Sequence, residues 1–191
     1  MKLLLHTCCA PCSVQCVDSL VAEGIRPDLC WYNPNIHPYT EYLSRRDALR
    51  SFAERNELSL IVEDEYLLRP FIKAVSSIEE NDTSGGRCAF CYWLRLDMAA
   101  RLASEKGYDA FSTTLLISPY QDHVLIRKTG ENLAAGNGLQ FLYRDFRPRF
   151  RQGQNQAREA GYYMQKYCGC IYSEEDRYLG NQGPREKRSG E

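Results

Sequence analysis

Short apolar runs alternate with amphipathic segments along most of the chain. The apolar runs have the length of buried strands and span residues 2–7, 27–32, 58–62, 110–117 and 139–143. The other segments have the spacing of amphipathic helices and span residues 11–22, 39–56, 71–78, 88–106, 122–135 and 154–165. Strands that alternate with helices predict a parallel sheet that is covered on both faces. We therefore expect an α/β fold, a Rossmann-like three-layer domain whose parallel sheet has about five strands.

A single domain accounts for this pattern. The chain has 191 residues, of which 43% are hydrophobic and 26% are charged, as in ordinary folded proteins. We expect one α/β domain over residues 1–179 and a flexible polar tail over residues 180–191. The first apolar run ends at His6, too early for a signal peptide, and no run has the roughly 18–20 apolar residues that cross a bilayer. We predict a cytoplasmic protein that does not bind membranes.

The chain contains nine cysteines, several of them clustered. In a reducing compartment, clustered cysteines are more often metal ligands or redox groups than structural disulfides. Cys8, Cys9 and Cys12 follow the first predicted strand, where open α/β sheets place their ligands. Cys88 and Cys91 begin a predicted helix, whose N-terminus lowers the pKa of a thiol and favours the thiolate that binds metal. The cysteines therefore indicate metal or thiol chemistry.

The spacing of these cysteines leaves three kinds of site open. A [4Fe–4S] cluster suits the vicinal pair, because adjacent cysteines point in different directions and a cluster has four separate iron corners. The ligands of such a cluster would be Cys8, Cys9, Cys88 and Cys91. Zinc would instead use two C-x-x-C pairs, which are Cys9 with Cys12 and Cys88 with Cys91. Cys9 and Cys12 alone resemble the redox motif of a thiol–disulfide oxidoreductase.

The remaining cysteines are of two kinds. Cys168 and Cys170 enclose Gly169, which allows the tight backbone that a disulfide across a C-x-C motif needs. Cys16 and Cys30 stand apart from the motifs, and we expect them to be small buried hydrophobic residues.

Arginine is concentrated in one segment near the C-terminus. Of the 24 basic residues 18 are arginine, while 25 acidic residues bring the net charge to −1. The clustered arginines are Arg144, Arg147, Arg149 and Arg151, and the aromatic residues among them are Tyr143, Phe146 and Phe150. Arginine with aromatic residues suits contact with phosphates and unpaired bases. A solvated loop, with Asp145 as an ion-pair partner, is the alternative.

Five ordered motifs resemble those of the QueH family of epoxyqueuosine reductases. They are HTCCAPC (residues 6–12), GRCAFCYWLRL (86–96), FSTTLLISPY (111–120), DFRP (145–148) and QKYCGCIYS (165–173). Together they span almost the whole chain. Five motifs in this order are far more specific than a single C-x-x-C.

The resemblance implies an enzyme of tRNA modification with a HUP-type Rossmann-like fold. Members of the family reduce epoxyqueuosine to queuosine at the tRNA wobble position, the last step of queuosine biosynthesis, without cobalamin. The implied partners are a tRNA that carries epoxyqueuosine in its anticodon loop and an electron donor that the sequence does not identify. The resemblance also favours the arginine segment as a contact with the anticodon loop, joined by Arg87 and Arg95.

The resemblance further implies a [4Fe–4S] cluster and an additional iron ion. The implied cluster ligands are Cys8, Cys9, Cys88 and Cys91, Cys12 is a candidate for the additional ion, and Cys168 and Cys170 are the redox-active disulfide pair. The reaction also needs a proton donor, for which the candidates by side-chain type are His6, His37, His123 and Tyr120. A zinc-stapled RNA-binding module and a thiol–disulfide oxidoreductase remain the alternatives.

Overall fold

Five parallel strands form the centre of the protein, whose computed structural model describes residues 1–79 and 86–180. The strands are β1 (Leu3–His6), β2 (Asp28–Trp31), β3 (Leu60–Val62), β4 (Ala110–Thr113) and β5 (Gln140–Phe141). They are hydrogen-bonded in the order β3-β2-β1-β4-β5, and every neighbouring pair is parallel. The expected α/β fold with a five-stranded parallel sheet is confirmed. The predicted tail beyond Gly180 lies outside the described residues.

β1 occupies the middle of the sheet because its side chains are apolar on both faces. Leu3, Leu4 and Leu5 are at most 1% exposed. A strand covered on both faces is a continuous apolar run, not an alternating one. The chain moves from β1 to β2 on one side and later crosses to β4 on the other. The loop after β1 therefore lies at the topological switch point of the sheet, where open α/β folds bind their ligands.

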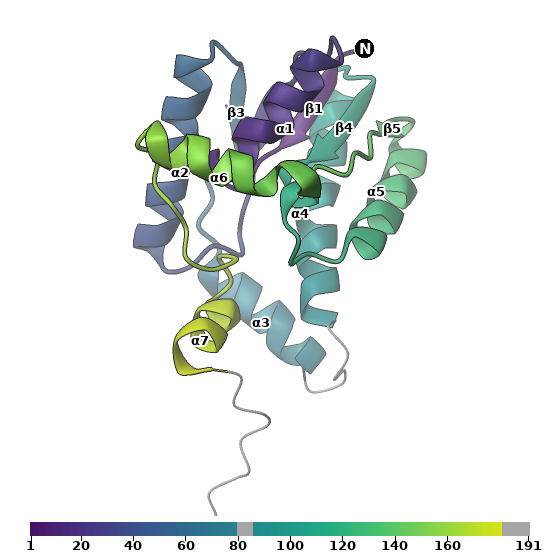
Figure 1. Ribbon diagram of the computed structural model, residues 1–191. Coiled ribbons are helices and arrows are strands. Elements are labelled where there is room, and N and C mark those ends of the chain that lie inside the picture. The colour runs from purple at the N-terminus through teal and green to yellow at the C-terminus, as the bar shows by residue number, and fades with distance from the viewer. Residues whose placement is uncertain (80–85, 181–191) are drawn as a thin grey trace, which may run out of the picture.

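The described part of the chain contains seven α-helices (Figure 1). They are α1 (Ala10–Ala22), α2 (Tyr39–Arg55), α3 (Leu68–Glu79), α4 (Gly86–Glu105), α5 (His123–Asn137), α6 (Phe150–Glu159) and α7 (Ile171–Leu179). α1 packs against α2 and α6, whereas α4 packs against β1, β4 and α5. None of the described helices combines the length and the apolar character that a membrane span needs.

The C-terminal segment returns to the carboxyl end of the sheet. In Figure 1, α6 crosses in front of α1, and α7 lies with α3 beyond the strand ends. Phe71 and Val75 of α3 pack in one apolar cluster with Cys91 of α4 and with Cys170, the residue before α7. This packing brings residues near position 170 close to the first turns of α4.

The structure differs from the predicted elements in three places, and in the first two a local feature of the chain explains the difference. The strand predicted over residues 110–117 ends at Thr113, whose hydroxyl accepts a hydrogen bond from Leu115 N (3.2 Å) and caps the 3₁₀ helix η1 (Thr114–Ile117). The helix predicted over residues 154–165 is α6, which ends before Gly161, a left-handed residue with φ 74°. The apolar spacing does not predict α7.

Candidate functional site

Three thiols lie together in the loop between β1 and α1. Cys8 and Cys9 precede α1, and Cys12 lies in its first turn. The Sγ atoms of these three residues, the thiol triplet, all lie within 4.8 Å of one another, and those of Cys8 and Cys9 are 3.8 Å apart. All three side chains are buried. Pro11 favours the helix start because its ring fixes φ and it has no N–H to leave unpaired.

The triplet overturns the expectation that Cys8 and Cys9 point in different directions. The chain bends at Cys8 and is extended at Cys9, the N-cap of α1. As a result the two sulfur atoms lie on the same side of the loop, 3.8 Å apart. A tetrahedral metal bound by thiolates at about 2.3 Å would set its sulfur ligands about 3.8 Å apart. The donor atoms therefore fit a thiolate-bound metal, and their directions do not exclude a single metal ion.

Hydrogen bonds among the sulfur atoms divide their charge unequally. Donation from Cys12 and Cys9 lowers the pKa of Cys8 well below its usual value. Burial raises the pKa of Cys9, and the hydrogen bond to Cys8 raises that of Cys12. Thr114 Oγ1 also donates to Cys8 Sγ (3.6 Å). Of the three thiols, Cys8 is therefore the one whose ionisation its surroundings favour, and thiolate is the form that binds metal.

Four further cysteines form a second group between α4 and α7. Cys88 and Cys91 lie in the first two turns of α4, and Cys168 and Cys170 immediately precede α7. Burial raises the pKa of Cys91 to about 12 and also raises that of Cys88, and in both cases the charge of Cys168 adds to the effect. The lowering expected from the helix N-terminus is therefore wrong for these two thiols, because burial outweighs it. All nine cysteines are free thiols. The fold therefore places the C-x-x-C and C-x-C motifs in one neighbourhood.

A buried guanidinium lies near both groups of thiols. Arg95 of α4 is 1% exposed and donates from Nε to the carbonyl of Cys91 (3.1 Å). Burial lowers the pKa of Arg95, but the charges of Cys91, Cys168 and Cys8 outweigh it and raise the value. Arg95 Nη2 is buried and has no hydrogen-bond partner among the described residues. A buried cation costs several kcal/mol unless an anion accompanies it, so this place suits a negatively charged group.

A cavity of about 420 Å³ opens onto the triplet, within the range of about 300–1,000 Å³ that ligand sites occupy. Its buried floor includes Cys8, Cys12, Arg45 and Arg95. The exposed residues at its edge are Tyr120, Lys166, Cys168 and Arg177. Aspartate and glutamate are absent from the described residues that line it. The cavity therefore suits an anionic ligand.

A hollow of about 660 Å³ between α3 and α7 is larger but has no such chemistry. Its lining is mainly apolar and includes Ile72, Ile171, Glu174 and Glu175. None of the described residues that line it is a cysteine. We therefore place the functional site at the smaller cavity.

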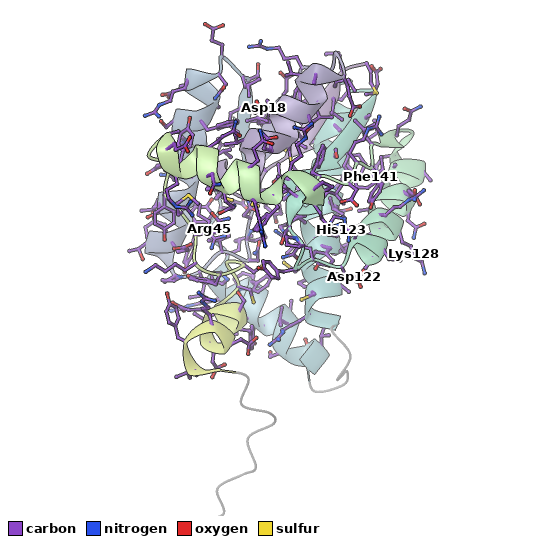
Figure 2. The ribbon with its side chains drawn as sticks, viewed as in Figure 1. Asp18, Arg45, Asp122, His123, Lys128 and Phe141 are labelled. Carbon is purple, nitrogen blue, oxygen red and sulfur yellow. The ribbon has the colours of Figure 1, made fainter. Side chains whose placement is uncertain are left out.

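Arg45 of α2, which is labelled in Figure 2, fixes the backbone around Cys168. Its buried guanidinium donates to the carbonyls of Cys168 (3.0 Å) and Tyr167 (2.9 Å) and to the carboxylate of Glu41 (2.7 Å). Gly169 has φ 119°, and a Cβ at this position would lie 3.1 Å from Arg45 Nη1. The motif needs glycine here because of both the backbone angle and this close approach. Arg45 thus holds Cys168 at the edge of the cavity.

We expect Arg45→Met to lower the free energy of unfolding by about 3–5 kcal/mol, because it leaves the Glu41 carboxylate buried without its cation. Urea unfolding at constant m-value measures the change. The double variant Glu41→Gln/Arg45→Met removes both charges and should recover part of the loss. Additive losses from the two single changes would show that the pair is not coupled.

The four candidate proton donors differ in burial: the three histidines are buried and Tyr120 is exposed. His6 bonds to Thr113 Oγ1 (2.9 Å) and Tyr32 O (3.1 Å), and burial lowers its pKa to about 4. Burial likewise lowers the pKa of His37 to about 4. His123, at the start of α5 in Figure 2, is buried with Nε2 against Ser118 O (3.1 Å). Of the four candidates only Tyr120 lines the cavity.

The arginine segment is partly neutralised by acidic neighbours. Arg144 pairs with Glu23 (3.0 Å), and Arg147 pairs with Asp145 (2.7 Å). Arg149 and Arg151 are exposed. Of the interleaved aromatic residues, Phe146 is buried, the ring of Tyr143 lies beneath Arg127, and Phe150 lines the cavity. Arg87 lies over the ring of Tyr172.

Two amide side chains at the cavity have contacts that the sequence does not predict, although Gln165 is the first residue of the QKYCGCIYS motif. Gln165 donates to Cys12 Sγ (3.4 Å), and Gln121 donates to Cys168 Sγ (3.6 Å). Arg45 is missed for the same reason, since it is one of several arginines on a polar helix. Only the tertiary contacts distinguish these residues from ordinary surface positions.

Comparison with known proteins gives one consistent family. Residues 3–176 match the protein family described as "Epoxyqueuosine reductase QueH". A curated relative of that name from Dehalococcoides mccartyi is 38% identical over 177 residues, 93% of this chain and 94% of the relative. Relatives of the same name from Acinetobacter baylyi and Thermotoga maritima are 36% and 33% identical, over 92% and 90% of this chain and 81% and 89% of their own lengths.

Proposed function

The chain belongs to the epoxyqueuosine reductase QueH family, and on this basis we propose that it reduces epoxyqueuosine to queuosine at the wobble position of tRNA. This reaction is the last step of queuosine biosynthesis. The observation that carries the proposal is the buried thiol triplet, two of whose members, Cys8 and Cys12, line a cavity whose described lining has cations and no carboxylate. Such a cavity suits a polyanionic substrate that is bound next to sulfur chemistry.

The proposed cofactors are a [4Fe–4S] cluster and an additional iron ion. The cluster ligands would be Cys8, Cys9, Cys88 and Cys91, and Cys12 would bind the additional ion. The sulfur distances within the triplet support thiolate-bound metal. Arg95, which is near Cys8 and Cys91 alike, would supply a compensating positive charge. When bound, the cluster supplies electron transfer and a Lewis-acidic iron.

The proposed redox pair is Cys168 with Cys170. Conversion of an epoxide to an alkene takes up two electrons and two protons and releases the oxygen as water. Oxidation of two thiols to one disulfide releases two electrons and two protons, so the step balances. An external reductant then returns the disulfide to the dithiol. The exposure of Cys168 at the edge of the cavity supports this role, because substrate and reductant both have to reach it.

The proposed contacts with tRNA are Arg144, Arg147, Arg149 and Arg151. We expect Arg149→Ala and Arg151→Ala each to weaken tRNA binding and to reduce the salt slope by about 1, because each loses one phosphate contact. Arg147→Ala should have a smaller effect, since Asp145 already neutralises that guanidinium. Filter binding at several salt concentrations measures both quantities. Equal effects of all three changes would mean that the Arg147–Asp145 ion pair breaks when the RNA binds.

Anaerobic purification followed by iron and sulfide analysis and an epoxyqueuosine-tRNA assay tests the function. A brown protein with broad absorbance near about 400 nm and roughly four irons is the expected result. One zinc per chain without sulfide would indicate a zinc-stapled RNA-binding module. Disulfide exchange that depends on Cys9 in a metal-free protein would indicate a thiol–disulfide oxidoreductase.

A further inference from the structure

An exposed aromatic residue stands on a fixed backbone at the edge of the cavity. Tyr120 is 84% exposed and lines the cavity, and its ring meets Phe150 edge to face, with centroids 6.1 Å apart at 87°. The hydroxyl of the buried Tyr92 donates to Gln121 Oε1 (2.7 Å) and accepts from Asp122 N (3.3 Å). The loop that carries Tyr120 is therefore ordered without help from the Tyr120 side chain.

The edge of the cavity also carries cations. Lys166 and Arg177 are exposed and line the same cavity as Tyr120. They come from the segment before α7 and from α7, whereas Tyr120 and Phe150 come from the loop after η1 and from α6. No ion pair ties either cation to a carboxylate among the described residues. An aromatic pair and two cations that form no ion pair with a described residue thus line one opening.

This combination matches unpaired RNA. Single strands bind where aromatic rings stack on bases and cationic side chains follow the phosphates. Bases are available for stacking in loops, which is where proteins read RNA. Arg177 and Lys166 would meet phosphates, and the deeper Arg95 and Arg45 keep the floor positive. The cavity itself is large enough for one nucleoside-sized ligand.

We propose that the Tyr120–Phe150 pair is a stacking site for a base next to the modified nucleotide, and that Lys166 and Arg177 bind the flanking phosphates. The proposal rests on the proposed function, because it places the anticodon loop across this opening. It assigns base stacking to these two rings and not to Tyr143 or Phe146, one covered by Arg127 and the other buried. A protein electron donor is the other macromolecule that would approach Cys168 here. We favour RNA over a protein electron donor, because docking of a protein and electron transfer to Cys168 do not require an exposed tyrosine beside a nucleoside-sized cavity.

The test uses the purified full chain and a labelled RNA hairpin with an anticodon stem and loop, and a fully paired duplex for comparison. We expect Tyr120→Ala to weaken hairpin binding by about 5- to 150-fold, the range for loss of one base–aromatic stack. Tyr120→Phe and Tyr120→Trp should restore the affinity. Tyr39→Ala, an exposed tyrosine of α2 outside the cavity lining, is the matched control and should change nothing. Lys166→Gln and Arg177→Gln should each reduce the salt slope by about 1.

The outcomes separate this proposal from the proposed function. Hairpin affinity that depends on Tyr120, in a protein that does not reduce epoxyqueuosine, would support the stacking site and overturn the reductase. Normal reduction with an unchanged KM in Tyr120→Ala would overturn the stacking site and leave the reductase intact. Equal losses on hairpin and duplex would overturn it as well, because a duplex offers no unpaired base. The stacking site would also be overturned if Tyr120→Ala bound RNA with unchanged affinity but was slower only when a protein supplied the electrons.

Discussion

Cys9→Ala should remove the proposed metal and the proposed reductase activity together. Cys9 lies 3.8 Å from Cys8 through their sulfur atoms, and it is 1% exposed, so no water or other ligand can easily replace its thiolate. Residues that act as one unit lose nearly the whole effect when one member is removed. We expect reduction of epoxyqueuosine-tRNA to fall by a factor of about 10³ or more. Iron and sulfide content per chain, with the visible absorbance, measures the loss of metal.

Cys16→Ala is the matched control for this change. Cys16 lies in the same helix and is fully buried, but it is not a member of the triplet. Its replacement should cost some stability through packing and leave the iron content and the activity unchanged. Full iron and sulfide content in Cys9→Ala would contradict the assignment of Cys9 as a ligand.

Two further variants test whether Cys88 or Cys12 is a ligand of the proposed cluster. Cys88→Ala should abolish the cluster as well as the activity, because it removes one thiolate corner. Cys12→Ala should keep the cluster absorbance and lose only the additional iron ion. The reverse result would assign Cys12, which lies within 4.8 Å of Cys8 and Cys9, to the cluster instead of Cys88.

Cys168→Ala should stop turnover while the cluster absorbance remains. The thiol is exposed at the edge of the cavity, where Gln121 donates to its sulfur (3.6 Å), and its carbonyl is held by Arg45. Loss of one thiol makes the two-electron oxidation of the C-x-C pair impossible, so we expect multiple turnover to fall by a factor of about 10³ or more. Spectroscopy of the purified variant and a tRNA assay measure the two properties separately.

The partner cysteine and the binding step provide the controls. Cys170→Ala should have the same effect as Cys168→Ala, because both thiols are needed for one disulfide. Binding of epoxyqueuosine-tRNA should be unchanged in both variants. Loss of absorbance together with turnover would make the C-x-C motif a metal ligand or a structural element instead of the redox pair.

Local physical properties of the sequence determined the parallel sheet and the position of the first cysteines at the end of its central strand. Continuous apolar runs such as residues 3–5 are typical of buried strands, and their alternation with amphipathic helices favours parallel pairing. The same order places Cys8 and Cys9 at the carboxyl end of the central strand. Both conclusions depend on residues that are neighbours in sequence.

Only the tertiary structure decided which of these groups meet. The bend at Cys8 brings its sulfur to that of Cys9, although alternation along an extended chain would separate them. Arg45 reaches the carbonyl of Cys168, 123 positions further along, and Arg95 is enclosed near thiols from both cysteine groups. Contacts over such separations depend on how the helices pack on the sheet, which the local pattern of apolar and polar residues does not specify. The sequence therefore determined which thiols and cations the chain contains, and the packing of the C-terminal segment on the strand ends decided that Cys8, Cys12, Cys168, Arg45 and Arg95 line one cavity.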